Sequence, residues 1–210
     1  MGIAVDGEAH LGPRPADAPL LEEHLSPPLA RLAQLLGKES DNFAAEMLTK
    51  ALGRAKGDTG STATGLRAIT EALAPLHLGD AVRLENGSGL FGESRATPAS
   101  VTAALAAGAL DAAIAPEFLA AFAVAGRDGT LKGRLGDVPA GRVRAKTGTL
   151  RNVSALSGWV LDVRGEPRFA FSVLANDVGG KIDSAKRLAD GVVRALVRAS
   201  DARTAGETAR

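Results

Sequence analysis

Apolar residues in the first part of the chain recur at the three- and four-residue spacing of amphipathic helices. The leucines between positions 29 and 36 share one face. We therefore expect a first helix with Ser26 as its cap, Pro27 or Pro28 in its first turn and Gly37 at its end. The same spacing and the helix-opening prolines predict later helices over 43–52, over 66–73, from Pro98 onward, and a short one from Pro116 onward.

The pattern changes near residue 142, where apolar and polar residues begin to alternate as they do in strands. We expect strands over 142–146, 153–163 and 168–175, with the last two joined by a tight turn at 164–166. A final helix is expected over 183–199, with Leu188 and Val192 among the residues of its broad apolar face. Helices followed by an antiparallel group of strands are typical of an α+β domain.

Composition narrows the classes of function. The chain has 210 residues, of which 45% are hydrophobic, and that is enough to build a core. Its 25 Lys and Arg residues nearly balance 24 Asp and Glu residues, so nucleic acid is not an expected partner. There is no cysteine, and His10, His24 and His77 lie far apart. We therefore expect no metal site and no cofactor.

We expect neither a signal peptide nor a transmembrane segment in this chain. No stretch approaches the ~20 apolar residues that span a bilayer, so no transmembrane segment is expected. The start, from Met1 to His10, lacks the basic and apolar regions of a secretory signal, so we expect no signal peptide in this chain. Residues 1–25 are rich in Gly, Pro and Asp and indicate an irregular lead-in, while residues 201–210 indicate a polar tail.

One glycine motif matches the spacing of a dinucleotide-binding loop. Gly87, Gly89 and Gly92 have that spacing, but no helix opens on the last glycine, because residues 93–97 are polar and the next helix is expected from Pro98. A glycine-rich turn is the plainer interpretation.

Two triplets carry more information. A Ser-Asp-Asn triplet at 40–42 lies in a loop between expected helices, and a Lys-Thr-Gly triplet at 146–148 lies at the end of an expected strand. Either alone is weak, because the first is an ordinary helix cap and the second an ordinary strand end. In this order and in these elements, the two triplets are similar to the second and third signatures of penicillin-recognising serine enzymes.

The resemblance extends over further landmarks of the class C low-molecular-mass penicillin-binding proteins, which are D-alanyl-D-alanine carboxypeptidases and endopeptidases of peptidoglycan. The landmarks are SDNFAAEML at 40–48, NGSGL at 86–90, RATP at 95–98, VAGRDGTL at 124–131, RAKTGTL at 144–150 and VSALSG at 153–158. The chain departs from the family pattern locally: Asn86 stands where the family usually has Asp, and residues 91–94 separate Leu90 from Arg95.

The resemblance implies catalytic roles for three residues. Ser40 would pass a proton between the base region and the leaving amine. The side-chain amide of Asn42 would hold the substrate amide and a catalytic lysine of the family that this chain lacks. Lys146 would supply a fixed positive charge. Asp41 is interpreted as a helix cap or a structural residue.

The resemblance also implies a substrate-binding wall. The Thr147 hydroxyl would meet the substrate carboxylate, Gly148 would let the substrate backbone lie close to the strand, and the Thr149 N–H would be one oxyanion donor. Arg95 and Arg151 would add carboxylate contacts, with a solvated surface role as the alternative for both.

The nucleophile of that family is absent from these residues. In the family it is the serine of a Ser-x-x-Lys motif, and no serine in this chain has a lysine three residues later. Ser184 has Arg187 in that place, and arginine cannot serve as a base. We therefore expect residues 26–200 to be the C-terminal part of a domain like the serine β-lactamases and transpeptidases, with an antiparallel sheet flanked by helices and its N-terminal part missing.

Three functional hypotheses follow. The first is a D-alanyl-D-alanine carboxypeptidase or endopeptidase that acts by serine acyl transfer when its N-terminal part is supplied. The second is a noncatalytic binder of peptidoglycan stem peptides, and the third is a structural remnant without a ligand. The resemblance implies stem peptides and β-lactams as partners and a periplasmic or other extracytoplasmic location. The reading frame upstream of Met1 distinguishes the first two hypotheses.

Overall fold

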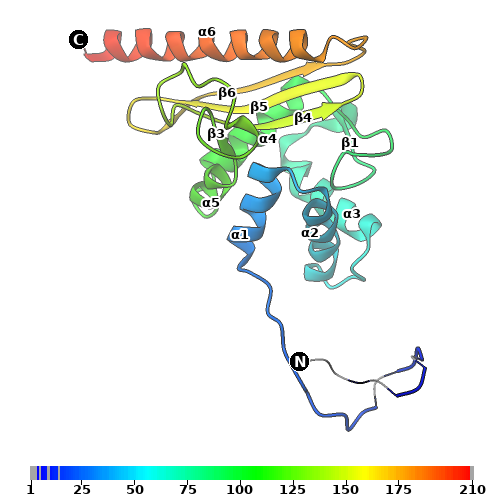
Figure 1. Ribbon diagram of the computed structural model, residues 1–210. Coiled ribbons are helices and arrows are strands. Elements are labelled where there is room, and N and C mark those ends of the chain that lie inside the picture. Colours follow the sequence, from blue (N-terminus) through cyan, green and yellow to red (C-terminus); the bar gives the residue numbers. More distant parts are fainter. Residues whose placement is uncertain (1–3, 5, 9, 14, 209–210) are drawn as a thin grey trace.

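An antiparallel sheet of four strands lies at the centre of the fold, in the order β3-β4-β5-β6 (Figure 1). The computed structural model describes residues 4, 6–8, 10–13 and 15–208. The strands are β3 (Ala123–Val124), β4 (Val143–Leu150), β5 (Val153–Leu161) and β6 (Pro167–Ala175). Helix α6 covers one face of the sheet, and the remaining helices lie on the other (Figure 1). The expected α+β class is confirmed.

The expected strand over 142–146 is too short. Strand β4 continues to Leu150, because a turn at residues 151–152 folds the chain back at once and pairs Lys146 with Ser157 and Leu150 with Val153. The Lys-Thr-Gly triplet therefore lies in the middle of a strand rather than at its end.

The hairpin of β5 and β6 matches the expected position of its turn. Gly165 adopts a positive φ of 87°, and the Asp162 carboxylate accepts hydrogen bonds from the Arg164 and Glu166 N–H groups at 2.8 and 3.0 Å. Strand β5 ends at Leu161, two residues earlier than expected, beside an irregularity in its register with β6 between Val160 and Leu161, whereas β6 begins at Pro167, one residue earlier in the sequence than expected.

The helices begin and end as follows: α1 (Leu29–Gln34), the π-helical turn η1 (Leu35–Glu39), α2 (Asn42–Ala55), α3 (Thr62–Leu73), α4 (Pro98–Leu110), α5 (Ala115–Ala120) and α6 (Ile182–Thr208). Short 3-10 turns occur at η2 (Ala74–Leu76), η3 (Gly79–Ala81) and η4 (Gly129–Leu131), and a small separate sheet pairs β1 (Val82–Arg83) with β2 (Arg95–Ala96). Helix α4 opens on Pro98 as expected, and Thr97 and Ser100 form a capping box.

The first helix differs from its expected form at both ends. Its cap position is Pro28, which makes no side-chain capping bond, so Ser26 is not the cap. The chain does not leave the helix at Gly37 but continues through η1 to Glu39. Glycine at position 37 instead lets η1 pack closely against the backbone of Ala121, since a Cβ there would lie 2.1 Å from the carbonyl oxygen of Ala121.

Two apolar clusters hold the sheet. The larger joins the sheet to α6, whose buried apolar residues are Ala189, Val193 and Val197. The prediction of one broad apolar face on α6 was therefore partly wrong, because Leu188 and Val192 on that face are 65% and 39% exposed. Helix α6 also runs past residue 199 into the expected polar tail. On the opposite face, Trp159 packs edge-on against the rings of Phe118 and Phe122, with centroids 5.4 and 4.6 Å away.

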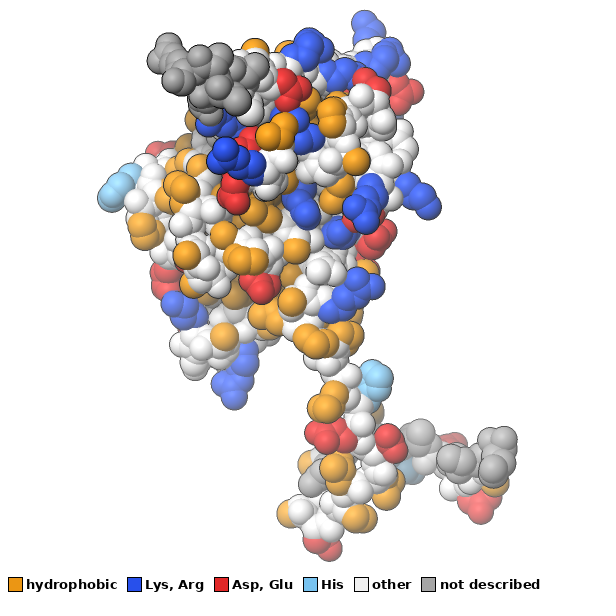
Figure 2. Space-filling model, turned by 90° about the vertical axis from the view of Figure 1, so that its left-hand side faces the viewer, with side chains coloured by type: hydrophobic (Ala, Val, Ile, Leu, Met, Phe, Trp, Pro, Cys, Tyr) orange, Lys and Arg blue, Asp and Glu red, His pale blue; other side chains and the backbone are white. Residues whose placement is uncertain are grey.

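The segment before α1 lies outside the body of the fold. Its described residues before position 28 form neither helix nor strand, and they extend away from the body of the molecule (Figure 2). Within the described part of the chain, no helix is both long enough and apolar enough to cross a membrane.

Candidate active-site cleft

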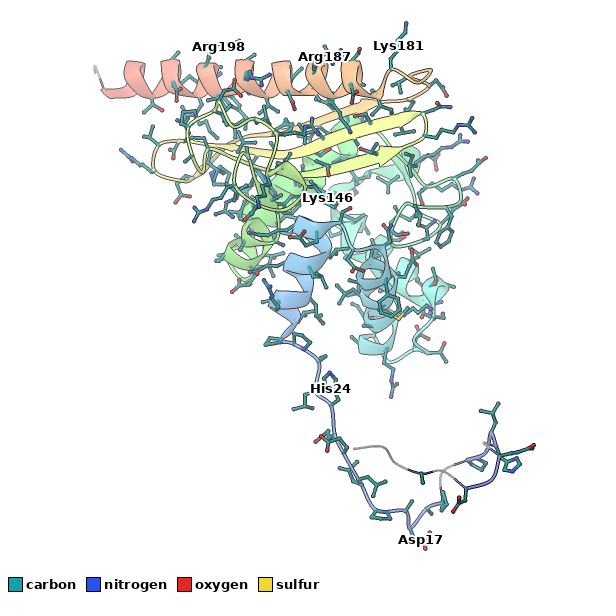
Figure 3. The ribbon with its side chains drawn as sticks, viewed as in Figure 1. Asp17, His24, Lys146, Lys181, Arg187 and Arg198 are labelled. Carbon is teal, nitrogen blue, oxygen red and sulfur yellow. The ribbon has the colours of Figure 1, made fainter. Side chains whose placement is uncertain are left out.

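The two triplets singled out in the sequence meet in space. The Nζ atom of Lys146 donates a hydrogen bond to Ser40 Oγ at 2.5 Å and a second to the carbonyl oxygen of Thr147 at 2.7 Å. Lys146 comes from β4 and Ser40 from the turn between η1 and α2, so the contact joins the sheet to the helices beneath it (Figure 3).

The alternation of β4 directs Lys146 toward the helices. Val143 and Ala145 point into the core under α6, so Lys146, one position further, points to the opposite face. Its side chain is half-buried there. Burial disfavours the charged ammonium and lowers the pKa of Lys146 below its ordinary value of 10.5.

Ser40 reverses the chain direction at the entrance to α2. Its φ and ψ of 58° and 43° are left-handed, a conformation that is uncommon for a residue other than glycine. The next residue, Asp41, caps α2 by accepting the Ala44 N–H at 2.7 Å, which confirms its expected role. Asn42 is the first residue of α2 and lines the same cleft as Ser40.

The segment 121–130 supports the turn that carries Ser40. Lys38 forms an ion pair with Asp128 at 2.6 Å, and Asp128 also accepts the Val124 N–H at 2.7 Å. Burial opposes the charge of Asp128, but these hydrogen bonds outweigh it and hold the pKa of Asp128 below its ordinary value. Gly129 approaches the Lys38 backbone so closely that a Cβ would lie 2.4 Å from the Lys38 carbonyl oxygen. Sequence reasoning did not assign these supports, although the VAGRDGTL landmark contains most of them.

Thr147 has a partner that sequence reasoning also missed. Its hydroxyl donates a hydrogen bond to the Thr130 hydroxyl at 2.8 Å, at the exposed end of the site. A ligand oxygen placed here would meet two adjacent hydroxyl groups.

A cleft of about 350 Å³ lies between β4 and the loop at residues 86–90. Of the expected substrate-binding residues, Thr147, Gly148 and Thr149 line it. The further lining residues are Ser40, Asn42, Ser88, Gly89, Leu90, Ser94, Lys146, Leu150, Val153 and Ala155.

The facing loop is held against α2. The Ser88 N–H donates to the Glu46 carboxylate at 2.8 Å, and the buried Asn86 accepts the Gly89 N–H at 2.6 Å through its side-chain oxygen. Gly87 passes so close to α2 that a Cβ would lie 2.7 Å from the Ala45 carbonyl oxygen, and Gly89 has a positive φ of 70°. These glycines therefore form a tight turn, as the plainer interpretation of the motif expected.

The structure does not bring Arg95 or Arg151 into the lining of the cleft. Arg95 lies on the exposed strand β2 and pairs with Glu93 at 2.9 Å. Arg151 is exposed in the turn between β4 and β5. Ser184 lies on α6, across the sheet from the cleft, where its hydroxyl accepts a hydrogen bond from Arg187 at 2.9 Å.

The backbone beside Lys146 is open to a ligand. Strand β3 pairs with β4 only at Arg144 and Ala145, so from Lys146 to Leu150 the outer edge of β4 has no neighbouring strand among the described residues. An extended peptide can pair with such an edge, and a half-buried ammonium next to two hydroxyls favours a carboxylate. The site therefore has the chemistry to bind a peptide with a free carboxyl terminus.

The chain is similar to a family of known proteins. The family model of the D-Ala-D-Ala carboxypeptidase 3 (S13) family matches residues 1–196. A D-alanyl-D-alanine carboxypeptidase of an Actinomadura species is 38% identical over 189 residues, which are 85% of this chain and 35% of the relative. The carboxypeptidase DacB of Haemophilus influenzae is 31% identical over 182 residues, covering 79% of this chain and 36% of that protein.

Solved structures of a penicillin-binding protein are similar to this chain in fold. The crystal structure of penicillin-binding protein 4 from Haemophilus influenzae aligns with a TM-score of 0.67 and 32% identity, over 79% of this chain and 37% of that one. The same protein in complex with a β-lactam aligns with a TM-score of 0.66 and 28% identity, over 85% of this chain and 45% of that one. The chain thus spans about a third of the length of the curated relatives it matches.

Proposed function

The chain belongs to the D-Ala-D-Ala carboxypeptidase 3 (S13) family, and from this premise we propose that it forms the substrate-binding part of a D-alanyl-D-alanine carboxypeptidase or endopeptidase. The substrate class is the peptidoglycan stem peptide, and the reaction is serine acyl transfer. The observation that carries the proposal is the 2.5 Å hydrogen bond from Lys146 Nζ to Ser40 Oγ at the floor of an open cleft.

Substrate would lie along the free edge of β4. Its terminal carboxylate would sit by the Thr147 hydroxyl and near the Lys146 ammonium, and Gly148 adds no side chain to obstruct the peptide backbone. The Thr149 N–H would donate to the oxygen of the scissile carbonyl as negative charge develops there. Each of these three strand residues lines the cleft.

The nucleophile would come from a Ser-x-x-Lys segment that the 210 residues do not contain. In the acylation step, that serine adds to the carbonyl carbon, and the amide bond to the leaving D-alanine breaks. Ser40 would pass a proton to the leaving amine, and Lys146 would keep the Ser40 hydroxyl oriented through their hydrogen bond. Asn42, at the first turn of α2, would hold the substrate amide.

We extend the proposal to β-lactams and to location. Penicillin-binding protein 4 of Haemophilus influenzae has been solved with a β-lactam, and that structure aligns with 85% of this chain. Because stem peptides occur in the cell wall, the proposed site of action is the periplasm or another extracytoplasmic space.

A noncatalytic stem-peptide binder is the second candidate. It would hold the stem peptide in the same cleft and form no covalent bond to it. The two candidates agree on the ligand and differ on whether a covalent acyl-enzyme forms.

Sequencing the complete reading frame and assaying its product separate these candidates. We expect a Ser-x-x-Lys motif upstream and release of D-alanine from a peptide that ends in D-Ala-D-Ala, with the release lost in a Lys146→Ala variant. A complete reading frame without that motif, whose product binds the peptide but releases no D-alanine, would establish the noncatalytic binder instead.

A further inference from the structure

The turn that carries Ser40 needs support from outside itself. Its left-handed φ and ψ of 58° and 43° cost free energy for a residue with a side chain, and such a backbone persists only where its surroundings hold it. The cap bond of Asp41 holds the side of the turn toward α2. The other side depends on η1, which packs against η4 and β3.

Asp128 connects η1 to the sheet. Its Oδ2 atom forms the 2.6 Å ion pair with Lys38, which precedes Ser40 by two residues. Its Oδ1 atom accepts the Val124 N–H at 2.7 Å. Val124 belongs to β3, and it pairs with β4 two residues before Lys146. One carboxylate therefore joins the segment before Ser40 to the strand that carries Lys146.

The hydrogen bond between Lys146 and Ser40 closes a ring of contacts through these elements. The ring runs from Ser40 through η1 and across the ion pair of Lys38 and Asp128 to β3. From β3 it crosses to β4 and returns through the 2.5 Å bond from Lys146 Nζ to Ser40 Oγ. The ion pair therefore constrains how near the Ser40 turn lies to β4. The second bond of Lys146, to the Thr147 carbonyl, lies within β4 and cannot set this distance.

The residues that follow Asp128 reinforce this connection. Gly129 packs against the backbone of Lys38 so closely that no Cβ would fit beside the Lys38 carbonyl oxygen. Thr130 accepts a hydrogen bond from the hydroxyl of Thr147 at 2.8 Å. The side chains of Lys38 and Asp128 are only 22% and 32% exposed, so water screens their attraction less than it would at the surface. The ion pair can therefore resist displacement of the turn.

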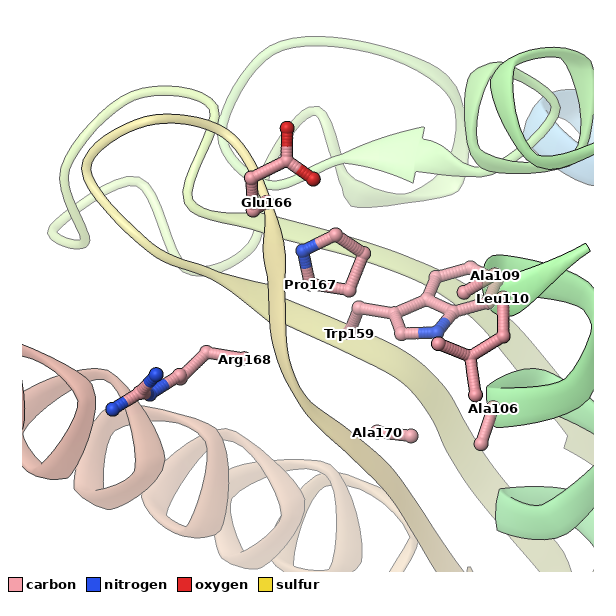
Figure 4. Close-up of a pocket in the computed structure, with 8 residues that line it drawn as sticks. All are labelled: Ala106, Ala109, Leu110, Trp159, Glu166, Pro167, Arg168 and Ala170. Atoms are coloured by element: carbon pink, nitrogen blue, oxygen red, sulfur yellow. The ribbon is translucent and has the colours of Figure 1, made fainter. Parts of the chain in front are cut away.

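A hollow of about 290 Å³ lies apart from this ring, between α4 and β6 (Figure 4). Its lining includes Ala106, Leu110 and Trp159, and no residue of the ring is among the described residues that line it. It borders β6, whereas Asp128 acts through β3 at the opposite edge of the four-stranded sheet. The ring therefore does not depend on what fills this hollow.

We propose that Asp128 is a positioning residue that holds the Ser40 hydroxyl against Lys146. It acts through Lys38, and it is not among the described residues that line the cleft. This inference rests on the proposed function, in which Ser40 passes a proton to the leaving amine. Because proton transfer depends steeply on the distance between the groups, displacement of the turn should slow acylation more than it weakens binding.

The chain offers a matched pair of variants for the test. Asp128→Asn removes the charge that pairs with Lys38 but retains a side-chain oxygen that can accept the Val124 N–H. Asp190→Asn breaks an ion pair of the same 2.6 Å length, with Arg134, whose two side chains are even less exposed. Asp190 lies on α6, across the sheet from the cleft (Figure 1). It is therefore the control for the loss of a structural ion pair.

Acylation by a penicillin, in the product of the complete reading frame, measures the effect on the reaction. We expect Asp128→Asn to lower the acylation rate constant at saturating penicillin by at least about tenfold, with a smaller change in the half-saturating concentration. Asp190→Asn should react at the wild-type rate. Lys38→Met removes the same ion pair from its other side, so it should lose a similar amount and covers the case in which Asp128→Asn fails to fold. The double variant should lose little more than either single variant.

An NMR titration of Lys146 tests the positioning role without any reaction. If Asp128 acted only as a negative charge, its removal would lower the pKa of Lys146 further. If Asp128 instead holds the turn over Lys146, Asp128→Asn should let water reach the ammonium, and the pKa should rise toward 10.5. The ¹³Cε chemical shift of Lys146 reports this change, and Asp190→Asn should cause none.

The two measurements separate this proposal from the proposed function. A wild-type protein that penicillin does not acylate would refute the proposed function, and the titration would still decide the role of Asp128. The positioning role is wrong if Asp128→Asn and Lys38→Met are acylated at the wild-type rate, or if the pKa of Lys146 stays constant or falls in Asp128→Asn. It is also wrong if Asp190→Asn lowers acylation as much, because any lost ion pair would then have the same effect.

Discussion

Lys146 and Ser40 stand 106 positions apart in the sequence, yet the Lys146 ammonium donates a 2.5 Å hydrogen bond to the Ser40 hydroxyl. This bond links strand β4 of the four-stranded sheet to the left-handed turn at Ser40, just before α2. Because the ammonium is half-buried, its charged form costs desolvation free energy, and water screens its electric field less than at the surface. Such a charge is typical of a position where it acts on a ligand or a reacting group.

Removal of either partner should impair the proposed reaction. In the product of the complete reading frame, Lys146→Ala and Ser40→Ala should each lower the acylation rate by at least about tenfold, because each group acts on developing charge or on proton transfer. Stopped-flow acylation by a penicillin measures the rate. Lys181→Ala, which removes an exposed lysine just before α6, is the control. Wild-type rates in both site variants would refute the assignment.

Thr147 should discriminate between ligands. Thr147→Val should reduce turnover of a D-Ala-D-Ala peptide more than acylation by penicillin, if its hydroxyl chiefly binds the carboxylate of the peptide. The expected loss is about 1 kcal/mol for a neutral hydrogen bond and about 1.5–3 kcal/mol for one to a charged group. Steady-state kinetics with both ligands measure the difference, and Thr130→Val controls for loss of the hydroxyl pair. Equal losses on both ligands would show that the hydroxyl is not selective.

The stability of the fold should depend on the protonation of Lys146. Its pKa is lowered in the folded chain and ordinary, at 10.5, in the unfolded chain. Between these two values the unfolded state binds more protons, so the free energy of unfolding rises with pH across that interval. Lys146→Met removes this titration, so the stability of the variant relative to wild type should fall as the pH approaches 10.5.

Urea unfolding at a series of pH values measures this relative stability. Lys181→Met, at an exposed lysine, is the control for replacing a lysine by methionine. A difference for Lys146→Met that is flat with pH would mean that the Lys146 ammonium is fully solvated in the folded protein.

The 210-residue chain alone should form no stable penicilloyl adduct and release no D-alanine. Serine is a weak nucleophile without an adjacent base, and no serine in the chain has the lysine that the motif requires. Ser40, the serine that Lys146 contacts, is assigned to the proton path. Intact-mass analysis after incubation with a penicillin reads the result directly. An added mass of one ligand, mapped to a single serine and lost on its replacement by alanine, would overturn this assignment.

Local patterns in the sequence predicted much of the fold. The hairpin of β5 and β6, the capped start of α4 and the final helix follow from alternation, a Thr-Pro pair and helical spacing within each segment. Long-range contacts were not predictable in this way. Gly37 resembles a helix stop in sequence, and only the approach of Ala121 shows that it serves packing.

In the site, too, local sequence motifs were predictable and long-range contacts were not. The family resemblance identified the two triplets, and in the structure Lys146 of one contacts Ser40 of the other. The resemblance also identified three residues of β4 that line the cleft. It did not assign the Lys38–Asp128 ion pair or the Thr130 hydroxyl, because each depends on which loops pack together. Leu188 was expected to be buried because helical spacing identifies an apolar face but not which part of it has a neighbour.

The central claim is that the cleft beside Lys146 binds a peptide through its free terminal carboxylate. Isothermal titration of the chain with a stem peptide that ends in D-Ala-D-Ala tests it most directly, with the same peptide amidated at its C-terminus and a Lys146→Met variant as comparisons. We predict binding of the free acid by the wild-type chain, and at least about tenfold weaker binding in both comparisons, since each loses one member of a charge pair. Equal binding of the acid and the amide, or no binding of either, would contradict the account.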